Sequence, residues 1–363
     1  MTTSATSTLR PRSAVVRMSE YHPPLAGRDG LRLDFNENTL APSPRVAAVL
    51  QNISAEGLTK YPEREHVERI VAAHFDLAAN AVLLTNGVDE AIHLLCETYL
   101  EPEDEVIVVT PTFSMYGVYA EATGATVRSI QADASLQFPA ASVLAAIRPN
   151  TRLIMLASPN NPTGAIVEPS VLLELAAKAP QAALLVDEAY YHFHGESVLS
   201  DTATVTNLFV TRTFSKAYGL AGLRIGLLAG HADAMRYVRK VSSPYNVNSI
   251  ALDCLPEALA DQAYIDWYSE QVRSSRLELE AALQNLRVPY WPSHANFTLM
   301  NIGPLHAALV AGMRQHGILI RDRSNDPGCN GCVRITVGTR EHTRRGIAAL
   351  QETLKEIQWQ PEK

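Results

Sequence analysis

Apolar and polar residues form alternating blocks along the middle of the chain, and these blocks predict strands separated by helices. Strands are predicted at residues 82–84, 105–110, 126–130, 153–157, 182–186, 208–210 and 225–229, and most of these segments are apolar runs. The gaps between them contain helical patterns at about 88–99, 115–122, 139–147 and 169–177. Runs that are apolar throughout are typical of strands covered on both faces. The pattern predicts an α/β fold built on a mostly parallel, seven-stranded sheet.

The pattern changes after residue 240, where two long amphipathic helices are predicted at 249–260 and 264–286. A smaller α/β unit follows, with strands at 296–300, 318–320 and 333–337 and helices at 305–316 and 340–357. In the last strand Val333 and Ile335 share one face, so Arg334 is held on the other. We expect an N-terminal arm (1–30), a large domain (56–245) and a small domain made of 31–55 and 246–363.

Composition and charge narrow the classes of function. The chain has 363 residues, of which 47% are hydrophobic, and this is ordinary for a globular protein of about two domains. The net charge of −7 gives no basic excess for nucleic acid or an anionic membrane, and no apolar stretch is long enough to span a bilayer. The first residues are rich in Ser and Thr and poor in acids, which favours a mobile arm over a transit peptide.

Four cysteines raise the question of a metal or redox site. Cys329 and Cys332 form a C-N-G-C pair, while Cys96 and Cys254 stand alone. A structural zinc site usually takes two such pairs, and the sequence has one. We therefore expect a turn with incidental cysteines, no metal, and a reduced, cytoplasmic protein.

One lysine, Lys216, lies between two of the apolar runs, in a loop that also contains several glycines. Burial lowers the pKa of a lysine and makes it a nucleophilic amine, suited to forming a Schiff base with an aldehyde. Thr211, Thr213, Ser215 and Arg224 add donors of the kind that bind a phosphate. An aldehyde that carries a phosphate describes pyridoxal 5′-phosphate (PLP). The segment alone also permits a surface-loop lysine beside a structural arginine.

Polar groups follow three other predicted strands, where ligands of a parallel sheet bind. The turn at Asn86 and Gly87 precedes a helix, whose free backbone N–H groups can bind an anion. The motif S-P-N-N-P-T-G occupies residues 158–164. Asp187 ends an apolar strand, and a carboxylate there needs a cation or strong donors. Asp187 as the N-cap of a turn is the alternative.

Along the chain, the glycine turn comes first, followed by S-P-N-N-P-T-G, Asp187, Lys216 with Arg224, and Arg334. In this order the motifs resemble the fold-type I PLP-dependent aminotransferases, and most closely the histidinol-phosphate aminotransferase family. The resemblance runs from about residue 21 to the last helix. Its most specific pieces are T-F-S-K-A-Y-G-L-A-G-L-R-I-G (213–226) and V-R-I-T-V-G-T-R-E (333–341). The family's N-E-N-P turn reads N-E-N-T here, at 36–39, and Val88 stands where a smaller residue is common.

The resemblance implies a cofactor site. Lys216 would hold PLP and move a proton during turnover, and Asp187 would pair with the pyridine nitrogen so that the ring is an electron sink. Asn161 and Tyr190 would donate hydrogen bonds to the phenolate oxygen, while Phe113 would stack on the ring. The residues implied for the phosphate are Gly87, Val88, Asp89, Thr213, Ser215 and Arg224.

Substrate and partner contacts are implied in the same way. Arg334 matches the family's carboxylate-binding arginine, and Arg321 matches a second arginine for a substrate phosphate. Tyr21 and Asn296 fall where substrate contacts are expected. Tyr61 matches a tyrosine that reaches the phosphate in the neighbouring subunit, which implies a homodimer with shared active sites.

The function implied is transamination between histidinol phosphate and 2-oxoglutarate. Histidinol phosphate carries a dianionic phosphate that can engage both Arg321 and Arg334, whereas a plain amino acid has one carboxylate. Arg321 could instead pair with Asp322 or Asp326 on the surface. An aromatic amino acid aminotransferase and a PLP-dependent decarboxylase of a phosphorylated amino acid remain alternatives. A PLP-binding regulator is disfavoured because no DNA-binding module is evident, and a nucleotide-binding protein because its glycine motifs do not occur.

Overall fold

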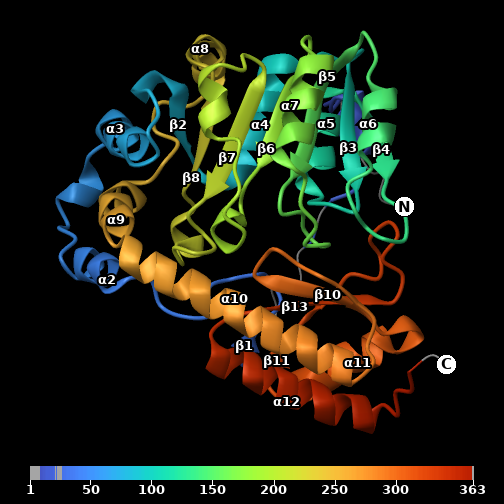
Figure 1. The fold of residues 1–363 in the computed structure, drawn as a ribbon. Helices are drawn as coiled ribbons and strands as arrows, with labels where there is room; N and C mark the ends of the chain where they lie inside the picture. Colours follow the sequence, from blue (N-terminus) through green and yellow to red (C-terminus); the bar gives the residue numbers. More distant parts are fainter. Residues whose placement is uncertain (1–8, 21, 23–26, 362–363) are drawn as a thin grey trace, which may run out of the picture.

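The computed structural model describes residues 9–20, 22 and 27–361, so the predicted contact at Tyr21 lies outside the described residues. A seven-stranded sheet has the order β2-β8-β7-β6-β5-β3-β4 (Figure 1). Its strands are β2 Val82–Thr85, β3 Glu105–Thr110, β4 Thr126–Gln131, β5 Thr151–Ala157, β6 Ala183–Asp187, β7 Leu208–Thr213 and β8 Gly226–Gly230. The predicted strands and the α/β fold class are confirmed.

The sheet is mixed because β8 runs antiparallel to both of its neighbours, β2 and β7. The other neighbouring pairs are parallel. A parallel connection needs a crossover, usually an α-helix, but β7 and β8 are joined by a loop whose only helix is the short 3-10 turn η5 Ala221–Leu223. The chain therefore turns back beside β7, and this return forms the lysine loop.

Helices cover both faces of this sheet. On one face Leu153 and Met155 of β5 pack with α4 Gly87–Tyr99, α5 Met115–Thr123 and α8 Ala232–Val241. On the other, Ile154 and Leu156 pack with α6 Ala140–Ala146 and α7 Pro169–Lys178. The strand is buried on both sides because its alternate residues join two different cores.

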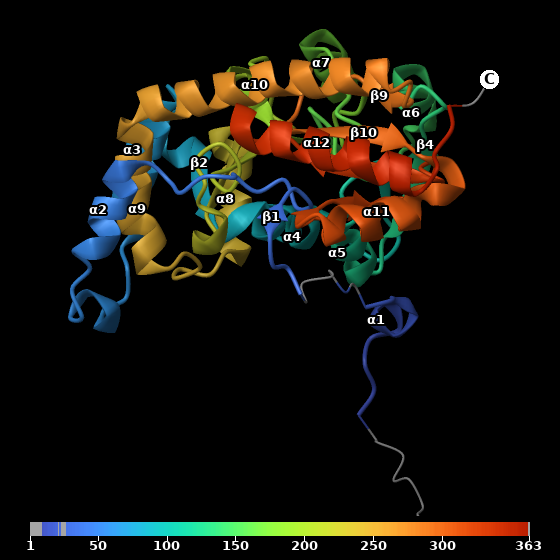
Figure 2. The same cartoon turned by 90° about the horizontal axis from the view of Figure 1, so that it is seen from below.

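A second, four-stranded antiparallel sheet has the order β12-β13-β10-β9 and lies below the first in Figure 1. Its strands are β9 Tyr290–Trp291, β10 Phe297–Asn301, β12 Arg321–Asp322 and β13 Cys332–Thr336. Figure 2 shows α10 Gln262–Asn285, α12 Arg340–Glu356 and α11 His306–Gln315 side by side against this unit. The predicted strand at 318–320 is shorter, because the chain pairs β11 Ile318–Leu319 with β1 Leu31–Arg32 and then enters β12 in the other sheet.

The structure describes four further α-helices. They are α1 Ser13–Arg17, α2 Pro44–Gln51, α3 Arg64–His74 and α9 Ser249–Ala260. Short 3-10 turns are η1 Gly57–Thr59, η2 Ala79–Ala81, η3 Tyr191–Phe193, η4 Ser200–Ala203 and η6 Gly303–Leu305. Helix α9 packs against both α2 and α3, so it contacts both sides of the predicted domain boundary, and the domain limits stay a prediction.

The four cysteines are buried and free. Cys329 and Cys332 lie in a turn closed by the Cys332 N–H, which donates to the Cys329 carbonyl at 2.8 Å, and they pack with Leu136 and Leu299. Within the described ranges, no group of three His, Cys, Asp or Glu side chains could hold a metal ion. No helix in those ranges has the length and apolarity needed to cross a membrane. The cytoplasmic location stays a prediction.

Candidate active site

A cavity of about 350 Å³ lies where the carboxyl ends of β5, β6 and β7 face the small sheet. Its walls bring together residues that are far apart in the sequence, such as Phe35, Phe113 and Arg334. Most of the predicted site residues line it: Val88, Asp89, Phe113, Asn161, Asp187, Tyr190, Thr213, Ser215, Lys216, Arg224, Arg321 and Arg334.

Lys216 follows β7 and extends its amine into this cavity. Its Nζ donates a hydrogen bond of 3.0 Å to the carbonyl of Phe35, and it lies 6.0 Å from the centre of the Tyr190 ring. Desolvation, with the charge of Arg334 as the next cause, lowers the pKa of Lys216 to about 8. The surface-loop alternative is therefore wrong, and the amine has the properties of a nucleophile.

Asp187 ends β6, and its carboxylate is buried. The Tyr116 hydroxyl donates to Oδ2 at 2.7 Å and the Ala189 N–H donates to Oδ1 at 3.0 Å. Burial raises the pKa of Asp187 to about 6, against the lowering effect of these two bonds. Among the residues that the structure describes, no Lys or Arg pairs with this carboxylate. Asp187 thus caps a turn with Oδ1, as the alternative hypothesis of an N-cap predicted. Its buried negative charge is still not compensated by a cation among the described residues.

Arg334 crosses the cavity from β13. Its Nη2 donates to the Asp34 carbonyl at 2.6 Å, its Nη1 donates to Oδ1 of Asn161, and its Nε has no partner among the described residues. Burial and the nearby charge of Arg323 lower the pKa of Arg334 to about 9. Because Asn161 uses its oxygen here, its Nδ2 amide is the group left for a cofactor oxygen.

Tyr190 and Asn36 form a second wall. Nδ2 of Asn36 donates to the Tyr190 hydroxyl at 2.9 Å, and the Thr336 hydroxyl donates to Oδ1 of Asn36 at 3.2 Å. Asn296 is fully buried and donates to the Asn36 carbonyl at 3.2 Å, so it stands behind Asn36 and does not line the cavity. The expected substrate contact at Asn296 is corrected to a support for Asn36.

The turn before α4 approaches the arginine of the lysine loop closely. Gly87 has φ +74°, and a Cβ at this position would lie 2.7 Å from Nη2 of Arg224. Arg224 forms an ion pair of 3.2 Å with Asp89, and its guanidinium is half exposed. The positive φ favours a glycine at this position, and the helix N-terminus and the Arg224 cation lie at the same corner of the cavity.

Hydroxyls complete that corner. Thr213 accepts a 3.0 Å hydrogen bond from the Ser215 N–H, and both side chains line the cavity. Thr211 is a correction, because its hydroxyl donates to the Leu227 carbonyl at 2.7 Å inside the sheet. Its donor is already used and is not available to a phosphate.

Arginines of the small sheet gather on the opposite wall. Arg321 lies directly across from Arg334 in the β12–β13 register and sits 5.1 Å above the Phe35 ring. Asp326 pairs with Arg323, which also lines the cavity. The surface pairing considered for Arg321 is therefore not found among the described residues, and Arg323 is a third arginine that the sequence analysis missed.

Three residues of the cavity wall were not predicted from the sequence: Tyr116, Arg323 and Asn36. Tyr116 belongs to an apolar helix, where nothing separates it from a core aromatic residue. Arg323 could have been found, since it lies two residues after Arg321 and alternate residues of an extended segment share a face. Asn36 lies in the turn where the family proline is absent.

Tyr61 lies away from this cavity, on the surface. It is 78% exposed and stacks on Tyr245, with ring centroids 4.4 Å apart. Its predicted action in a neighbouring subunit stays a prediction.

Comparisons with known proteins agree on one family. The chain matches the family described as aminotransferase class I and II over residues 28–350. It is 35% identical to histidinol-phosphate aminotransferase of Symbiobacterium thermophilum over 362 residues, covering 95% of this chain and 99% of that protein. The enzyme of the same name from Moorella thermoacetica is 32% identical over 361 residues, covering 94% and 92%.

Solved structures agree on the fold. Histidinol-phosphate aminotransferase of Sinorhizobium meliloti, in complex with pyridoxal-5′-phosphate, superposes with a TM-score of 0.86 at 23% identity, covering 98% of this chain and 100% of that one. L-threonine-O-3-phosphate decarboxylase of Porphyromonas gingivalis gives 0.78 at 24%, covering 90% and 99%. At these identities the likeness concerns the fold alone.

The residues of the cavity fit PLP. The nucleophilic amine of Lys216 suits its aldehyde, the buried carboxylate of Asp187 lacks the cation that a protonated pyridine supplies, and the corner at Gly87 and Arg224 suits its phosphate. This fit adds to the family match over residues 28–350 and the two relatives above 30% identity. The chain belongs to the aminotransferase class I and II family and is a PLP-dependent transaminase.

Proposed function

We propose that this transaminase takes histidinol phosphate as amino donor and 2-oxoglutarate as acceptor, in histidine biosynthesis. The observation that carries the proposal is the group of arginines, Arg321, Arg323 and Arg334, on the cavity wall opposite the cofactor corner. The donor's phosphate is a dianion, and two planar guanidiniums can share its oxygens. The names of the two relatives above 30% identity support the same donor.

The acceptor makes use of the same wall. 2-Oxoglutarate carries two carboxylates, one of which suits Arg334, while the other can be bound by Arg321. Asp326 opposes the charge of Arg323, so Arg321 is the less compensated of the two outer arginines. One cationic wall can thus bind both substrates in turn.

The cavity residues divide the work around the cofactor. When bound, PLP supplies an electron sink for the substrate Cα. Lys216 would hold the cofactor through Nζ at its aldehyde carbon, with the aldehyde oxygen leaving as water, and its free amine would carry the proton to and from the substrate Cα. Asp187 would keep the ring nitrogen of the bound cofactor protonated, which would strengthen the electron sink. Tyr190 and the Asn161 amide would hold the ring oxygen, and Phe113 would cover a ring face.

Cofactor contacts across a dimer belong to the same proposal. Tyr61 and Tyr245 form an exposed aromatic pair on a surface that also exposes Leu58, and a second copy of the chain is the partner that the family resemblance implies. In that dimer Tyr61 reaches the phosphate bound by the partner subunit.

The alternatives differ in the charges of their substrates. An aromatic amino acid offers a single carboxylate and leaves Arg321 without a partner. A phosphorylated amino acid offers a phosphate and a carboxylate, and would suit the same arginines. The decarboxylase therefore stays the nearer alternative on charge, and it is separated from the proposal by its product, carbon dioxide.

A donor panel tests the proposal. The holoenzyme is given histidinol phosphate, phenylalanine, tyrosine or O-phosphothreonine with 2-oxoglutarate, and glutamate and carbon dioxide are measured. We expect glutamate formation with the highest kcat/KM for histidinol phosphate, and no carbon dioxide. A higher kcat/KM for phenylalanine, or carbon dioxide from O-phosphothreonine, contradicts the proposed substrate.

A further inference from the structure

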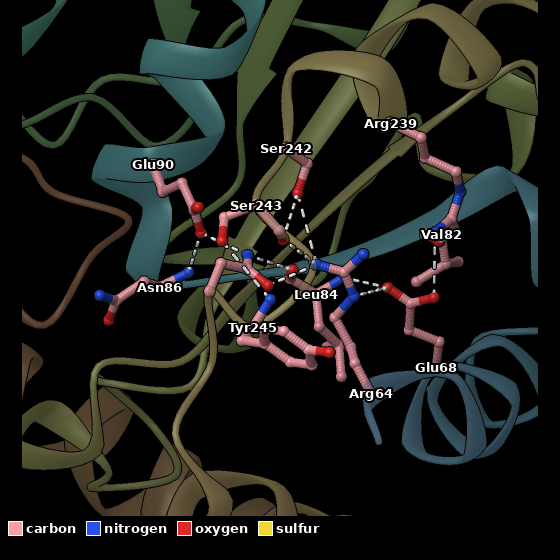
Figure 3. Close-up of polar contacts among 11 residues, drawn as sticks. Arg64, Glu68, Val82, Leu84, Asn86, Glu90, Arg239, Ser242, Ser243 and Tyr245 are labelled. Carbon is pink, nitrogen blue, oxygen red and sulfur yellow. Dashed lines mark hydrogen bonds and ion pairs between the residues drawn. The ribbon is translucent and has the colours of Figure 1, made fainter. Parts of the chain in front are cut away.

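A polar network lies behind the turn that precedes α4, outside the cavity. β2 is an edge strand that pairs with β8 on one side only. On its other side the backbone groups of Val82 and Leu84 are bonded by side chains instead of by a further strand (Figure 3). Such an edge is normally left to solvent or covered. Here three backbone groups of the edge, the Val82 carbonyl and the N–H and carbonyl of Leu84, are each hydrogen-bonded to a side chain.

Buried Glu68 holds the first part of that edge. Its Oε1 accepts a 3.0 Å hydrogen bond from the Leu84 N–H and pairs at 3.0 Å with Nε of Arg64. Its Oε2 pairs at 3.1 Å with Arg239, whose guanidinium also donates to the Val82 carbonyl. Two arginines therefore compensate one buried carboxylate, which makes the arrangement rigid.

Asn246 holds the second part and uses both ends of its amide. Its Nδ2 donates to the Leu84 carbonyl at 3.0 Å and to Oε2 of Glu90 at 2.6 Å, while Nη1 of Arg64 donates to its Oδ1. Oε2 of Glu90 in turn accepts a hydrogen bond from the Asn86 N–H. Asn246 thus joins the end of β2 to the first turn of α4, on either side of Gly87.

We propose that Asn246, acting through Glu90, is a positioning residue for the cofactor phosphate. It fixes the Asn86–Gly87 turn so that the N-terminal N–H groups of α4 point into the cavity corner occupied by Arg224. The inference rests on the proposed placement of the PLP phosphate at that corner. A backbone anion site depends on the direction of its N–H groups, so loosening the turn weakens phosphate binding while leaving the amine of Lys216 intact.

Two ligands separate this role from a general effect on folding. PLP and pyridoxal share the aldehyde and the ring and differ in the phosphate, so the ratio of their dissociation constants reports the phosphate contacts alone. Both are measured by absorbance titration of the apoprotein. We expect Asn246→Ala to lower the preference for PLP over pyridoxal about tenfold, since the half-buried amide that bonds both the Leu84 carbonyl and Glu90 is lost.

Glu90→Ala provides a second variant, and it should show the same selective loss with pyridoxal binding unchanged. Asn207→Ala is the matched control. The Asn207 amide also bonds backbone carbonyls, those of Ala176, Ala179 and Ala182, but at the start of β7, away from the cavity. The control should lose thermal stability and keep the full preference for PLP.

The outcomes are distinct. An unchanged PLP preference in both Asn246→Ala and Glu90→Ala overturns the inference, and so does an equal loss of preference in Asn207→Ala. A wild-type protein without any preference for PLP over pyridoxal would instead contradict the placement of the phosphate at this corner. The phosphorus-31 resonance of bound PLP gives an independent readout, and it should move in Asn246→Ala but not in Asn207→Ala.

Discussion

Replacing Arg321 by alanine tests the substrate assignment most directly. Arg321 reaches the cavity from β12, has no ion-pair partner among the described residues, and is kept in place by the Phe35 ring at 5.1 Å. Its removal leaves Lys216 and Asp187 untouched. The variant should therefore bind PLP normally, which is checked by its absorbance spectrum before any kinetics.

The size of the effect follows from the contact that is lost. A hydrogen bond to a charged group contributes about 1.5–3 kcal/mol, and the half-buried Arg321 belongs near the middle of that range because solvent screens part of its charge. A loss of about 2 kcal/mol lowers kcat/KM for histidinol phosphate roughly thirtyfold. For phenylalanine, which has one carboxylate for Arg334, the change should stay within about threefold.

Two arginine variants control this experiment. Arg321→Lys keeps the charge but loses the planar pair of donors, so it should recover part of the activity toward histidinol phosphate. In Arg323→Ala the lost charge was already opposed by Asp326, and its effect on the ratio between donors should be smaller. Equal losses for histidinol phosphate and phenylalanine in Arg321→Ala would refute the assignment of the phosphate to Arg321.

The remaining predictions concern the cofactor and the dimer. Because the pKa of Lys216 is lowered to about 8 from 10.5, about a tenth of its amine is neutral at pH 7. Reconstitution of the apoprotein with PLP should accelerate with pH up to about 8 and then level off; a rise that continues to pH 10 would contradict the lowered pKa. Asp187→Asn should keep PLP bound but lower kcat about a hundredfold or more, because the partner of the ring nitrogen loses its charge; near-normal turnover in a steady-state assay would leave Asp187 as a turn cap only. Mixing Lys216→Ala with Tyr61→Phe protein should give activity above the parents' mean, since heterodimers carry one site without either lesion; no gain after verified subunit exchange argues against sharing.

The sequence predicted the large sheet well because most of its strands are apolar runs between turn residues; the edge strand β4, which contains Arg128 and Ser129, is the exception. It predicted that Lys216 and Asp187 belong to the cavity, because a charge at the end of an apolar strand is costly unless it has a partner. The sequence did not predict α8 and β12, because their apolar patterns are weak. Helix α8 buries only Met235 and Val238 among charged residues, and β12 is a strand of two residues. Tyr116 could not be predicted as a site residue, because the sequence of an apolar helix does not distinguish it from an aromatic residue of the core. Only the structure shows that its hydroxyl donates to Asp187.

Asn296 shows a different limit. Its place beside β10 was predicted, but its depth was not, because depth depends on Asn36, which arrives from a segment 260 residues away in the chain. Contacts of that range are set by packing between the two sheets and leave no local pattern. The resemblance placed the residue near the substrate, and the structure puts another asparagine in between.

The arginine wall also affects how substrates reach the enzyme. The chain as a whole carries a net charge of −7, yet the cavity is lined by five basic side chains and three acidic ones: Lys216, Arg224, Arg321, Arg323 and Arg334 against Glu37, Asp89 and Asp187. An anion at long range therefore meets a repelling surface, and only near the mouth does the local potential attract it. Both fields are screened over about 10 Å at 0.1 M salt, so ionic strength should act on the encounter rate in two opposing ways and leave a shallow dependence.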